Sequence, residues 1–340
     1  MLFPLLYLSR YGLTLARNQQ CGLYTGNVNI NGNLVNVIFD TGSSSFWATE
    51  KSVGCSWNPS SPWSAEYGSG TVSGFACSSP IEVDVPDSCN TKFSETNFPV
   101  QTRTERGKVL CDNTNGILGL GAISSPAAVG IPFLRYFNRQ SSCKKNTNFK
   151  WTNTGANQAS VVFGEEIVTE GYHREMLYSK KKCSYERWSV ALTNVEIDGI
   201  QVRLPKTEEI VFDTGSTDIV LPEYMATTIN SKNFRFEFQN NFITINSDQQ
   251  QTMVIFEGTI PVFGQALIQF LDIQFDAIDE SVRFKAASAI GSNPVTVGKL
   301  TESATVDAPE ECLSEIALHY AILIVVALIL LCLLYCLCVR

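Results

Sequence analysis

Two aspartates stand in nearly the same sequence context, one in each half of the chain. Asp40 ends the apolar run 37–39, Asp213 ends the apolar run 210–212, and Thr-Gly-Ser follows both. A carboxylate at the end of a wholly apolar strand is costly unless it is paired or functional. Two carboxyls that lie close together cannot both ionise, so one keeps its proton while the other acts as a base. The pair therefore predicts acid–base catalysis by Asp40 and Asp213.

The repetition of the motif carries this prediction. A single Asp-Thr-Gly is weak evidence for a catalytic aspartate, because average residue usage gives about one chance occurrence in fifteen chains of this length. The ordinary role of an Asp before Thr-Gly is that of a turn residue or cap. Two copies that each follow an apolar strand and precede the same Ser would arise by chance in fewer than about one chain in a thousand.

The elements expected to position the two aspartates are strands and tight turns. Short runs rich in Val, Ile and Phe alternate with clusters of Gly, Asn, Ser and Pro, which is typical of an all-β protein. Residues 24–30 and 34–39 are two such runs around Asn31-Gly32-Asn33, and Asn-Gly favours a hairpin turn. We therefore expect Asp40 just after a strand.

The two copies of the motif also divide the chain. They lie 173 residues apart, which indicates two lobes of related architecture rather than a short-period repeat. Each half has a further strand-like run with glycine after its Asp motif, at 116–121 and 261–270. We expect an N-terminal β lobe at 17–170 and a C-terminal β lobe at 171–295.

The Asp motifs and the segment Tyr67-Gly68-Ser69-Gly70 resemble those of the pepsin-like aspartic peptidases, over roughly residues 23–287. The resemblance implies an all-β, bilobal acid protease fold with the active-site cleft between the lobes. It also implies an endopeptidase, in which a water held between Asp40 and Asp213 attacks a peptide bond of an extended polypeptide. The mechanism needs no covalent intermediate and no metal, and we expect no cofactor.

The resemblance assigns supporting roles to residues beside the dyad. Thr41 and Thr214 are implied to brace the two Asp loops against each other at the lobe interface. Ser43 and Ser216 match hydroxyls that bond the outer carboxylate oxygens.

A glycine-rich hairpin at 65–74 matches the flap that covers the substrate in this family. Trp47 and Tyr67 match a pair whose hydrogen bond steadies the flap, although a plain core role would explain Trp47 equally well. Gly42 and Gly215 match positions where the substrate main chain passes close, which excludes a side chain. The residues implied to bind substrate are Gly42, Trp47, Tyr67, Gly68, Ser69, Ile117, Gly215 and Thr217.

Two features depart from the family pattern. Gln265 follows Phe263-Gly264, where many relatives carry an acidic residue, and the loss of a nearby negative charge favours ionisation of the dyad. The second lobe also looks shortened, because 51 residues separate Asp213 from Gly264 whereas 79 separate Asp40 from Gly119.

The cysteines indicate an oxidising compartment. The chain has eleven, and eight of them precede the last apolar segment, which allows up to four disulfides. Eight cysteines allow 105 pairings, so the connectivity stays open. A zinc site is disfavoured, because there is no Cys-x2-Cys pair and the histidines are only two, His173 and His319. The eight cysteines are Cys21, Cys55, Cys77, Cys89, Cys111, Cys143, Cys183 and Cys312.

The charge of the chain argues against nucleic acid and anionic lipid as partners. Its formal net charge is −8 and its sequence pI is about 5.0, whereas such partners require a basic surface.

The two ends of the chain suggest targeting segments. Residues 1–16 have an apolar stretch and a small residue at Ala16, which fits a possible signal peptide, although a basic start is missing. Residues 320–339 carry no charge over a length that can cross a bilayer as a helix, and an acidic stalk at 296–319 precedes them. We expect a monomeric, single-pass type I membrane protein with a lumenal or extracellular catalytic part. A GPI signal remains the alternative for the tail.

Two other functions compete with the peptidase. Some proteins of this fold have lost catalysis and bind peptides or inhibit other enzymes; the intact Asp and Gly residues of both motifs argue against that here. An adhesin on a membrane stalk would explain the cysteines and the apolar tail but not the repeated Asp motif.

Overall fold

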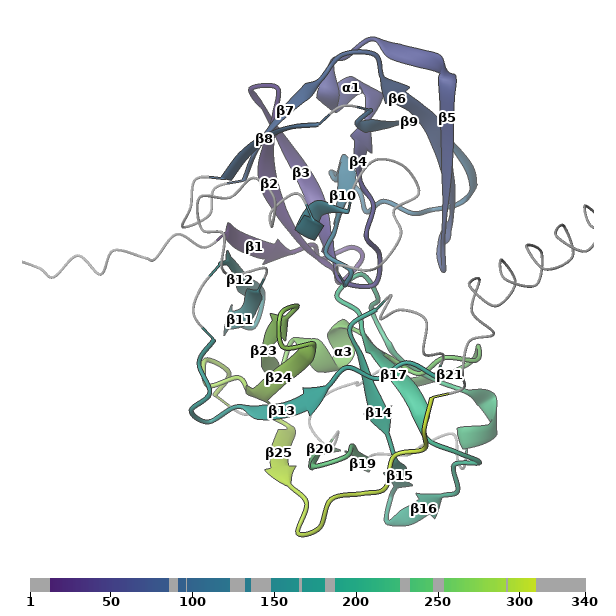
Figure 1. Ribbon diagram of the computed structural model, residues 1–340, viewed down its shortest axis with the longest axis vertical. Coiled ribbons are helices and arrows are strands. Elements are labelled where there is room, and N and C mark those ends of the chain that lie inside the picture. The colour runs from purple at the N-terminus through teal and green to yellow at the C-terminus, as the bar shows by residue number, and fades with distance from the viewer. Residues whose placement is uncertain are drawn as a thin grey trace, which may run out of the picture.

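The computed structural model describes residues 13–85, 91–95, 97–122, 132–135, 148–164, 167–180, 187–226, 233–246, 254–291 and 293–309. These residues form two β lobes, one above the other in Figure 1, which meet where the Asp-bearing loops lie.

The first lobe begins with strands that build a broad sheet and then a long hairpin. Its elements are β1 (Leu13–Arg17), β2 (Tyr24–Ile30), β3 (Asn33–Asp40), β4 (Phe46–Thr49), α1 (Glu50–Val53), β5 (Trp57–Tyr67), β6 (Gly70–Cys77), β7 (Ile81–Val85), β8 (Thr91–Glu95), β9 (Pro99–Gly107), β10 (Gly116–Gly119), β11 (Phe149–Gly155) and β12 (Gln158–Phe163).

The second lobe has shorter strands in two five-stranded sheets, and β13, β23 and β24 join it to the first lobe. Its elements are β13 (His173–Met176), β14 (Ser189–Leu192), β15 (Asn194–Ile197), β16 (Ile200–Val202), β17 (Glu208–Phe212), β18 (Ile219–Leu221), the 3-10 helix η1 (Glu223–Met225), β19 (Asn233–Glu237), β20 (Asn241–Asn246), β21 (Val254–Phe256), β22 (Val262–Phe263), α3 (Gln265–Ile268), β23 (Leu271–Asp276), β24 (Ser281–Ala286) and β25 (Val295–Lys299).

The predicted hairpin between the first two strands of the Asp40 motif is confirmed. β2 and β3 pair antiparallel with Ile30 opposite Asn33. Asn31 and Gly32 have φ angles of 51° and 82°, the left-handed conformation that a two-residue hairpin turn requires.

Each Asp motif is built by the same strand arrangement. In the first lobe β10 lies between β3, to which it is parallel, and β4, to which it is antiparallel. In the second lobe β22 lies in the same way between β17 and β18. The two glycine-containing runs recognised in the sequence therefore supply β10 and β22, and each one holds an Asp loop in place.

One continuous sheet crosses from lobe to lobe. β11 of the first lobe pairs antiparallel with β23, and β23 pairs with β24, which pairs with β13. Buried aromatic rings cover this junction: Phe149 stacks on Phe275 at 4.5 Å between ring centroids, and Trp188 meets Phe275 edge-on at 5.2 Å. The sheet and these rings fix the angle at which the lobes meet.

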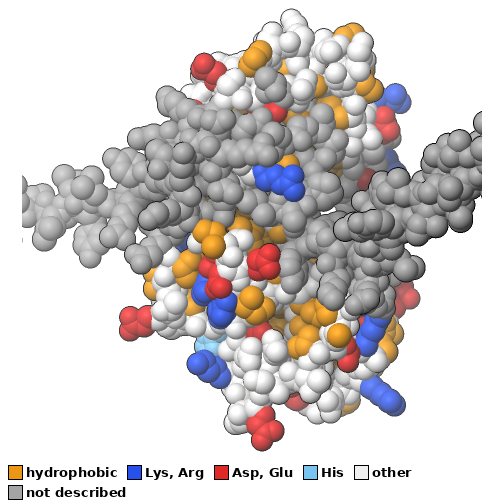
Figure 2. All heavy atoms as spheres, viewed as in Figure 1, with side chains coloured by type: hydrophobic (Ala, Val, Ile, Leu, Met, Phe, Trp, Pro, Cys, Tyr) orange, Lys and Arg blue, Asp and Glu red, His pale blue; other side chains and the backbone are white. Residues whose placement is uncertain are grey.

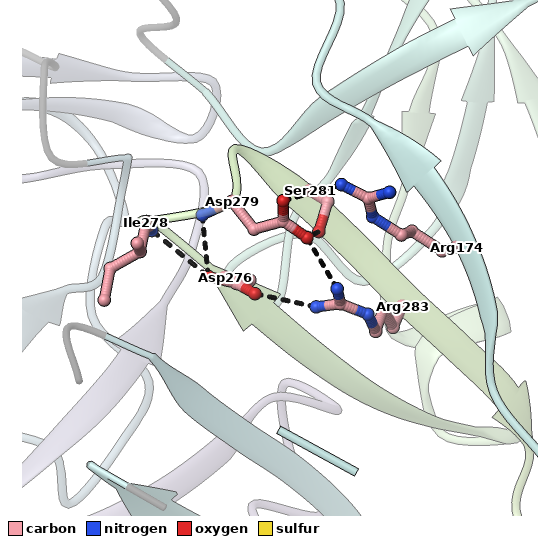
Figure 3. A network of polar contacts seen from close by, with 6 residues as sticks. All are labelled: Arg174, Asp276, Ile278, Asp279, Ser281 and Arg283. Atoms are coloured by element: carbon pink, nitrogen blue, oxygen red, sulfur yellow. Dashed lines mark hydrogen bonds and ion pairs between the residues drawn. The ribbon is translucent and has the colours of Figure 1, made fainter. Parts of the chain in front are cut away.

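A polar network closes the β23–β24 turn (Figure 3). Oδ1 of Asp276 accepts the backbone N–H of Ile278 at 3.1 Å and of Asp279 at 2.9 Å. The Arg283 guanidinium donates to Asp276 at 2.7 Å and to Asp279 at 2.6 Å, and Arg174 pairs with Asp279 from β13. Arg283 and Asp276 are both buried, so their charges depend on each other for compensation.

The surface carries charges of both signs. On the face in Figure 2, Lys and Arg side chains lie among Asp and Glu side chains and form no continuous basic area in the described part of that face.

Two of the expected segment boundaries fall inside strands of the structure. Leu13 and Leu15 belong to the hydrophobic core, and β1 pairs with both β2 and β12, so a cleavage after Ala16 would remove most of a core strand. At the other end, β25 pairs with β20, and Asp307 exchanges hydrogen bonds with Thr207 at 2.7 and 3.0 Å. The segment expected as a stalk from residue 296 thus begins within the second lobe.

The membrane segment expected at 320–339 lies outside the described residues. Within the described ranges, no helix has the length and apolar character needed to cross a bilayer.

All four described cysteines form disulfides. Cys21 pairs with Cys111, and Cys55 pairs with Cys77. Such bonds persist in an oxidising compartment, so they place this part of the chain in a secretory lumen or outside the cell. Cys89, Cys143, Cys183 and Cys312 lie outside the described residues.

Candidate active site

The two Asp loops are joined by reciprocal threonine hydrogen bonds. The backbone N–H of Thr41 donates to Oγ1 of Thr214 at 3.0 Å, and the N–H of Thr214 donates to Oγ1 of Thr41 at 2.9 Å. Each hydroxyl then donates across the interface, Thr41 to the carbonyl of Phe212 and Thr214 to that of Phe39. Both threonines are fully buried, and these four bonds give each of their N–H groups and hydroxyls a partner, which holds the loops in one relative position.

Two glycines allow the carboxyls to approach each other. A Cβ on Gly42 would lie 2.3 Å from Cγ of Asp213, and a Cβ on Gly215 would lie 2.3 Å from Oδ1 of Asp40. The sequence suggested that these glycines leave room for substrate backbone. The structure gives a further and nearer reason, because the opposite aspartate fills the space of a side chain.

The hydrogen bonds received by the two carboxylates differ. Asp40 accepts from the N–H of Gly42 at 2.8 Å and from the Ser43 hydroxyl at 2.5 Å. Asp213 accepts from the N–H of Gly215 at 2.7 Å. Within the described residues the Ser216 hydroxyl makes no matching bond to Asp213, and only its backbone N–H reaches the Asp213 carbonyl. Asp40 therefore has the better compensated negative charge.

The electrostatics favour a protonated Asp213. Burial raises the pKa of its carboxyl well above the ordinary range, and the charge of Asp40 and a hydrogen bond with Asp40 raise it further. The N–H of Gly215 and the positive charge of Arg187 act in the opposite direction. The geometry thus gives one carboxylate and one carboxylic acid side by side, which is the arrangement that acid–base catalysis needs.

A hydrogen-bonded chain links the dyad to the hairpin above it. Nε1 of Trp47 donates to the hydroxyl of Tyr67 at 2.6 Å, and the Tyr67 hydroxyl also interacts with Ser43, the donor to Asp40. Burial raises the pKa of Tyr67, so the phenol stays a neutral hydrogen-bonding group. Tyr67 sits at the end of β5, where it pairs with Gly70 of β6, and the dipeptide 68–69 forms the turn.

An open cleft of about 740 Å³ contains the dyad. Most of the residues proposed from the sequence line it, whereas Thr41 and Thr214 are fully buried beneath it and Trp47 is buried behind Tyr67. The predicted residues on the cleft surface are Asp40, Gly42, Ser43, Tyr67, Gly68, Ser69, Ile117, Asp213, Gly215, Ser216 and Thr217.

The two walls of the cleft have different compositions. On the first lobe, Leu23, Ile38 and Ile117 belong to a buried apolar cluster that also includes Trp47. The Cys21–Cys111 disulfide lines this wall as well. Its contribution could not be foreseen, because the sequence fixes no pairing among eight cysteines.

The opposite wall carries a basic residue that the sequence analysis missed. Arg187 lines the cleft near Asp213, immediately before the buried Trp188. No short motif marks this position in the sequence, because Arg187 reaches the cleft through the pairing of the following strand, β14, with β17.

Gln265 lies directly behind the second Asp loop. Its Nε2 donates to the carbonyl of Thr214 at 2.9 Å, and its side chain is fully buried. Oε1 of Gln265 has no hydrogen-bond partner among the described residues. A neutral amide thus stands where an acid would add negative charge behind Asp213.

No group of three or more His, Cys, Asp and Glu side chains within the described ranges is arranged to hold a metal ion.

Comparisons with known proteins agree with this site. Residues 23–270 match the family described as eukaryotic aspartyl protease. The chain is 25% identical over 254 residues to pregnancy-associated glycoprotein 2 of Sus scrofa, which covers 68% of this chain and 59% of that protein. It is 27% identical over 204 residues to pepsin-2B of Gadus morhua, which covers 55% of this chain and 60% of that protein. The matches thus span about three fifths of each relative. With its duplicated Asp loops and the cleft between its lobes, the chain belongs to the eukaryotic aspartyl proteases.

Proposed function

We propose that this chain is an aspartic-type endopeptidase that cleaves polypeptides with a water held between Asp40 and Asp213. The observation that carries the proposal is the close packing of the two carboxyls, each against the glycine of the opposite loop, at the floor of an open cleft. A turn or capping role would not require both aspartates to share one buried site.

The two aspartates take different roles in the proposed reaction. Asp40, which accepts two hydrogen bonds, is the carboxylate and removes a proton from the water. Asp213, whose pKa is raised by burial and by Asp40, donates its proton to the carbonyl oxygen of the scissile bond. The division of one proton between two carboxyls is already established for aspartic proteases.

The substrate is an extended peptide segment lying between the lobes. The flap tip at Gly68 and Ser69 and the second loop at Thr217 present groups for its backbone, and apolar side chains of the cleft face its side chains. Ile117 and Tyr67 form part of the first-lobe surface for such a side chain.

The test is cleavage of an unfolded protein substrate by the full-length chain between about pH 3 and about pH 7. Asp40→Asn and Asp213→Asn should each lower kcat/KM by about a thousandfold or more, since each removes one proton-transfer group. The matched control is Glu302→Gln, which neutralises an exposed acid outside the cleft and should leave the rate unchanged.

The alternative is a peptide-binding or inhibitor protein without activity. A folded wild type that binds a statine peptide in the cleft but cleaves nothing across this pH range would replace the peptidase proposal with that function. Cleavage that survives in both Asp variants would refute the role of the dyad.

We also propose that residues 320–339 anchor the chain as a single-pass type I membrane protein with a lumenal or extracellular catalytic part. The charge-free run of twenty residues supports this. Deletion of 310–340 should release the protein from carbonate-washed membranes, and a full-length chain recovered entirely in the soluble fraction would contradict the anchor. We further propose that the catalytic part acts as a monomer.

A further inference from the structure

The geometry points to Arg187 as a specificity-determining residue that binds an acidic side chain of the substrate. This inference rests on the proposed peptidase function and adds the chemical class of the preferred substrate, a polypeptide with Asp or Glu near the scissile bond.

The position of Arg187 follows from strand pairing in the second lobe. Ser189 lies opposite Val211 in the antiparallel pair of β14 and β17, and the N–H of Phe212 donates to the carbonyl of Trp188 at 2.9 Å. Continuation of this register by two residues places Arg187 opposite Asp213, on the same side of the sheet. The charge of Arg187 indeed acts on the Asp213 carboxyl. The guanidinium therefore lies within electrostatic reach of the dyad, on the cleft surface.

The surface next to Arg187 is apolar. Val211 pairs with Val262, Val262 with Val220, and Val220 with Ile255, so these four residues form one row across the sheet. All four line the cleft, as Arg187 does. A substrate that places an apolar side chain on this row brings a neighbouring side chain of the same peptide to Arg187.

Arg187 is available for such a contact. It is half-buried, and it has no hydrogen bond or ion pair with another side chain in the described part of the chain. Lys108, the second cation among the described cleft residues, is already paired with Asp112 at 2.6 Å. Among the remaining cleft acids, Asp218 accepts the Thr217 hydroxyl at 2.5 Å. A carboxylate from the substrate would give the guanidinium an ion-pair partner, and none of the described side chains supplies one.

Among the described residues, the charges that face the cleft besides the dyad are Glu66, Lys108, Asp112, Arg187, Asp218 and Glu257. Acids outnumber bases in this set, so the described lining would repel an acidic peptide. A preference for an acidic side chain therefore has to come from one local contact, and Arg187 is the side chain placed to make it.

The experiment compares short peptides that differ only in Glu or Gln, with the exchange made at each position on either side of the scissile bond. The full-length wild type should prefer Glu by about tenfold in kcat/KM at one position, equivalent to roughly 1.4 kcal/mol. Arg187→Leu should lower the ratio to about one. The Arg187→Glu variant should instead prefer a peptide with Lys at that position. The control Arg203→Leu removes an exposed cation outside the cleft and should keep the wild-type ratio.

Two results would overturn the inference: equal cleavage of Glu and Gln peptides at every position, or an unchanged preference in Arg187→Leu. The wild-type preference should also fade as the pH drops through about 4.3, because a protonated Glu carries no charge for the guanidinium.

Binding separates this inference from the peptidase proposal. Anisotropy with an uncleavable, reduced-bond version of each peptide measures Kd in the Asp40→Asn variant, where no turnover is needed. Tighter binding of the Glu peptide, lost on adding Arg187→Leu, supports the contact even if the wild type cleaves nothing. Equal Kd values for the two peptides would refute it even if the enzyme is active.

Discussion

Gly42 and the carboxyl of Asp213 occupy adjoining space across the lobe interface: a Cβ on Gly42 would lie 2.3 to 2.5 Å from three atoms of that carboxyl. The second loop repeats the relationship, with Gly215 against Asp40. The spacing of the dyad is therefore set by the absence of two side chains.

Gly42→Ala should abolish most of the activity. Its methyl group cannot fit beside Asp213, so either the carboxyl or the loop must move, and a displacement of about 1 Å can lower a rate about a hundredfold. The kcat/KM of the variant is the measurement, together with its circular dichroism. Gly291→Ala is the control, because a Cβ there meets nothing within 4 Å. Normal kcat/KM in Gly42→Ala would show that the dyad is not as tightly packed as described.

Arg187→Leu should extend activity toward higher pH on a neutral substrate. The positive charge of Arg187 lowers the pKa of Asp213, so its removal raises that pKa and keeps the acid protonated over a wider range. The basic limb of the pH profile of kcat/KM should move to higher pH, while Arg203→Leu leaves it in place. A basic limb that moves to lower pH would contradict the assignment of Asp213 as the acid.

Asp272→Asn should change the free energy of unfolding, relative to the parent protein, more favourably at neutral pH than at acid pH. Asp272 is buried in β23, where burial raises the pKa of its carboxyl above the ordinary 3.8, against smaller effects of the Asn153 N–H, Lys285 and Lys150. The folded state therefore binds more protons than the unfolded state, and its free energy of unfolding falls as the pH rises from about 3.8 through the folded pKa.

The measurement is urea denaturation at about pH 3 and about pH 7 in an Asp40→Asn background, which avoids self-digestion. The free energy of unfolding of Asp272→Asn minus that of its parent should be larger at the higher pH. Oδ1 of the new Asn can still accept the N–H of Asn153, which Asp272 accepts at 3.1 Å. Glu302→Gln, an exposed substitution, should show no such difference, and the opposite sign for Asp272→Asn would exclude a raised pKa.

Arg283→Met should destabilise the protein by about 3–5 kcal/mol, because it leaves the buried carboxylate of Asp276 without its cation. Arg283→Lys should recover only part of the loss, since an ammonium cannot reproduce the two bonds to Asp276 and Asp279 shown in Figure 3. Denaturant midpoints at constant m-value provide the measurement. A Met variant as stable as the wild type would mean that the network contributes no net stability.

The sequence predicted those parts of the site that depend on short segments. An apolar run, Asp-Thr-Gly-Ser and a later glycine strand are each local, and they led to Asp40, Asp213 and the strands β10 and β22. Arg187 was missed because its place in the cleft depends on the register of β14 against β17.

The strands at the two ends of the described chain escaped prediction for a different physical reason. An apolar stretch such as the one ending at Ala16 is compatible with a signal peptide and equally with a core strand, and the pairing of β1 with β2 and β12 depends on residues elsewhere in the chain. Similarly, β25 is a short run, Val-Thr-Val-Gly-Lys, and its place in the second lobe depends on backbone hydrogen bonds to β20, which its sequence does not specify.

The two disulfides should differ in what their removal does. Paired Cys→Ser substitutions at either bond should cost about 2–5 kcal/mol of unfolding free energy. The Cys21–Cys111 bond spans 90 residues and the Cys55–Cys77 bond only 22, so loop entropy makes the first loss larger by about 1 kcal/mol.

Of the two disulfides in the described part of the chain, Cys21–Cys111 lines the cleft and Cys55–Cys77 does not, so removal of the first should also raise KM for peptides with a large apolar side chain on the first-lobe wall. The Cys55–Cys77 variant is the matched control, because it loses a disulfide away from the cleft and should keep the wild-type KM. Steady-state kinetics at a temperature where both variants are folded measures this difference. If both variants showed the same KM, the Cys21–Cys111 bond would act on stability alone, and the first-lobe wall would owe its shape to the apolar cluster around Ile38 and Ile117.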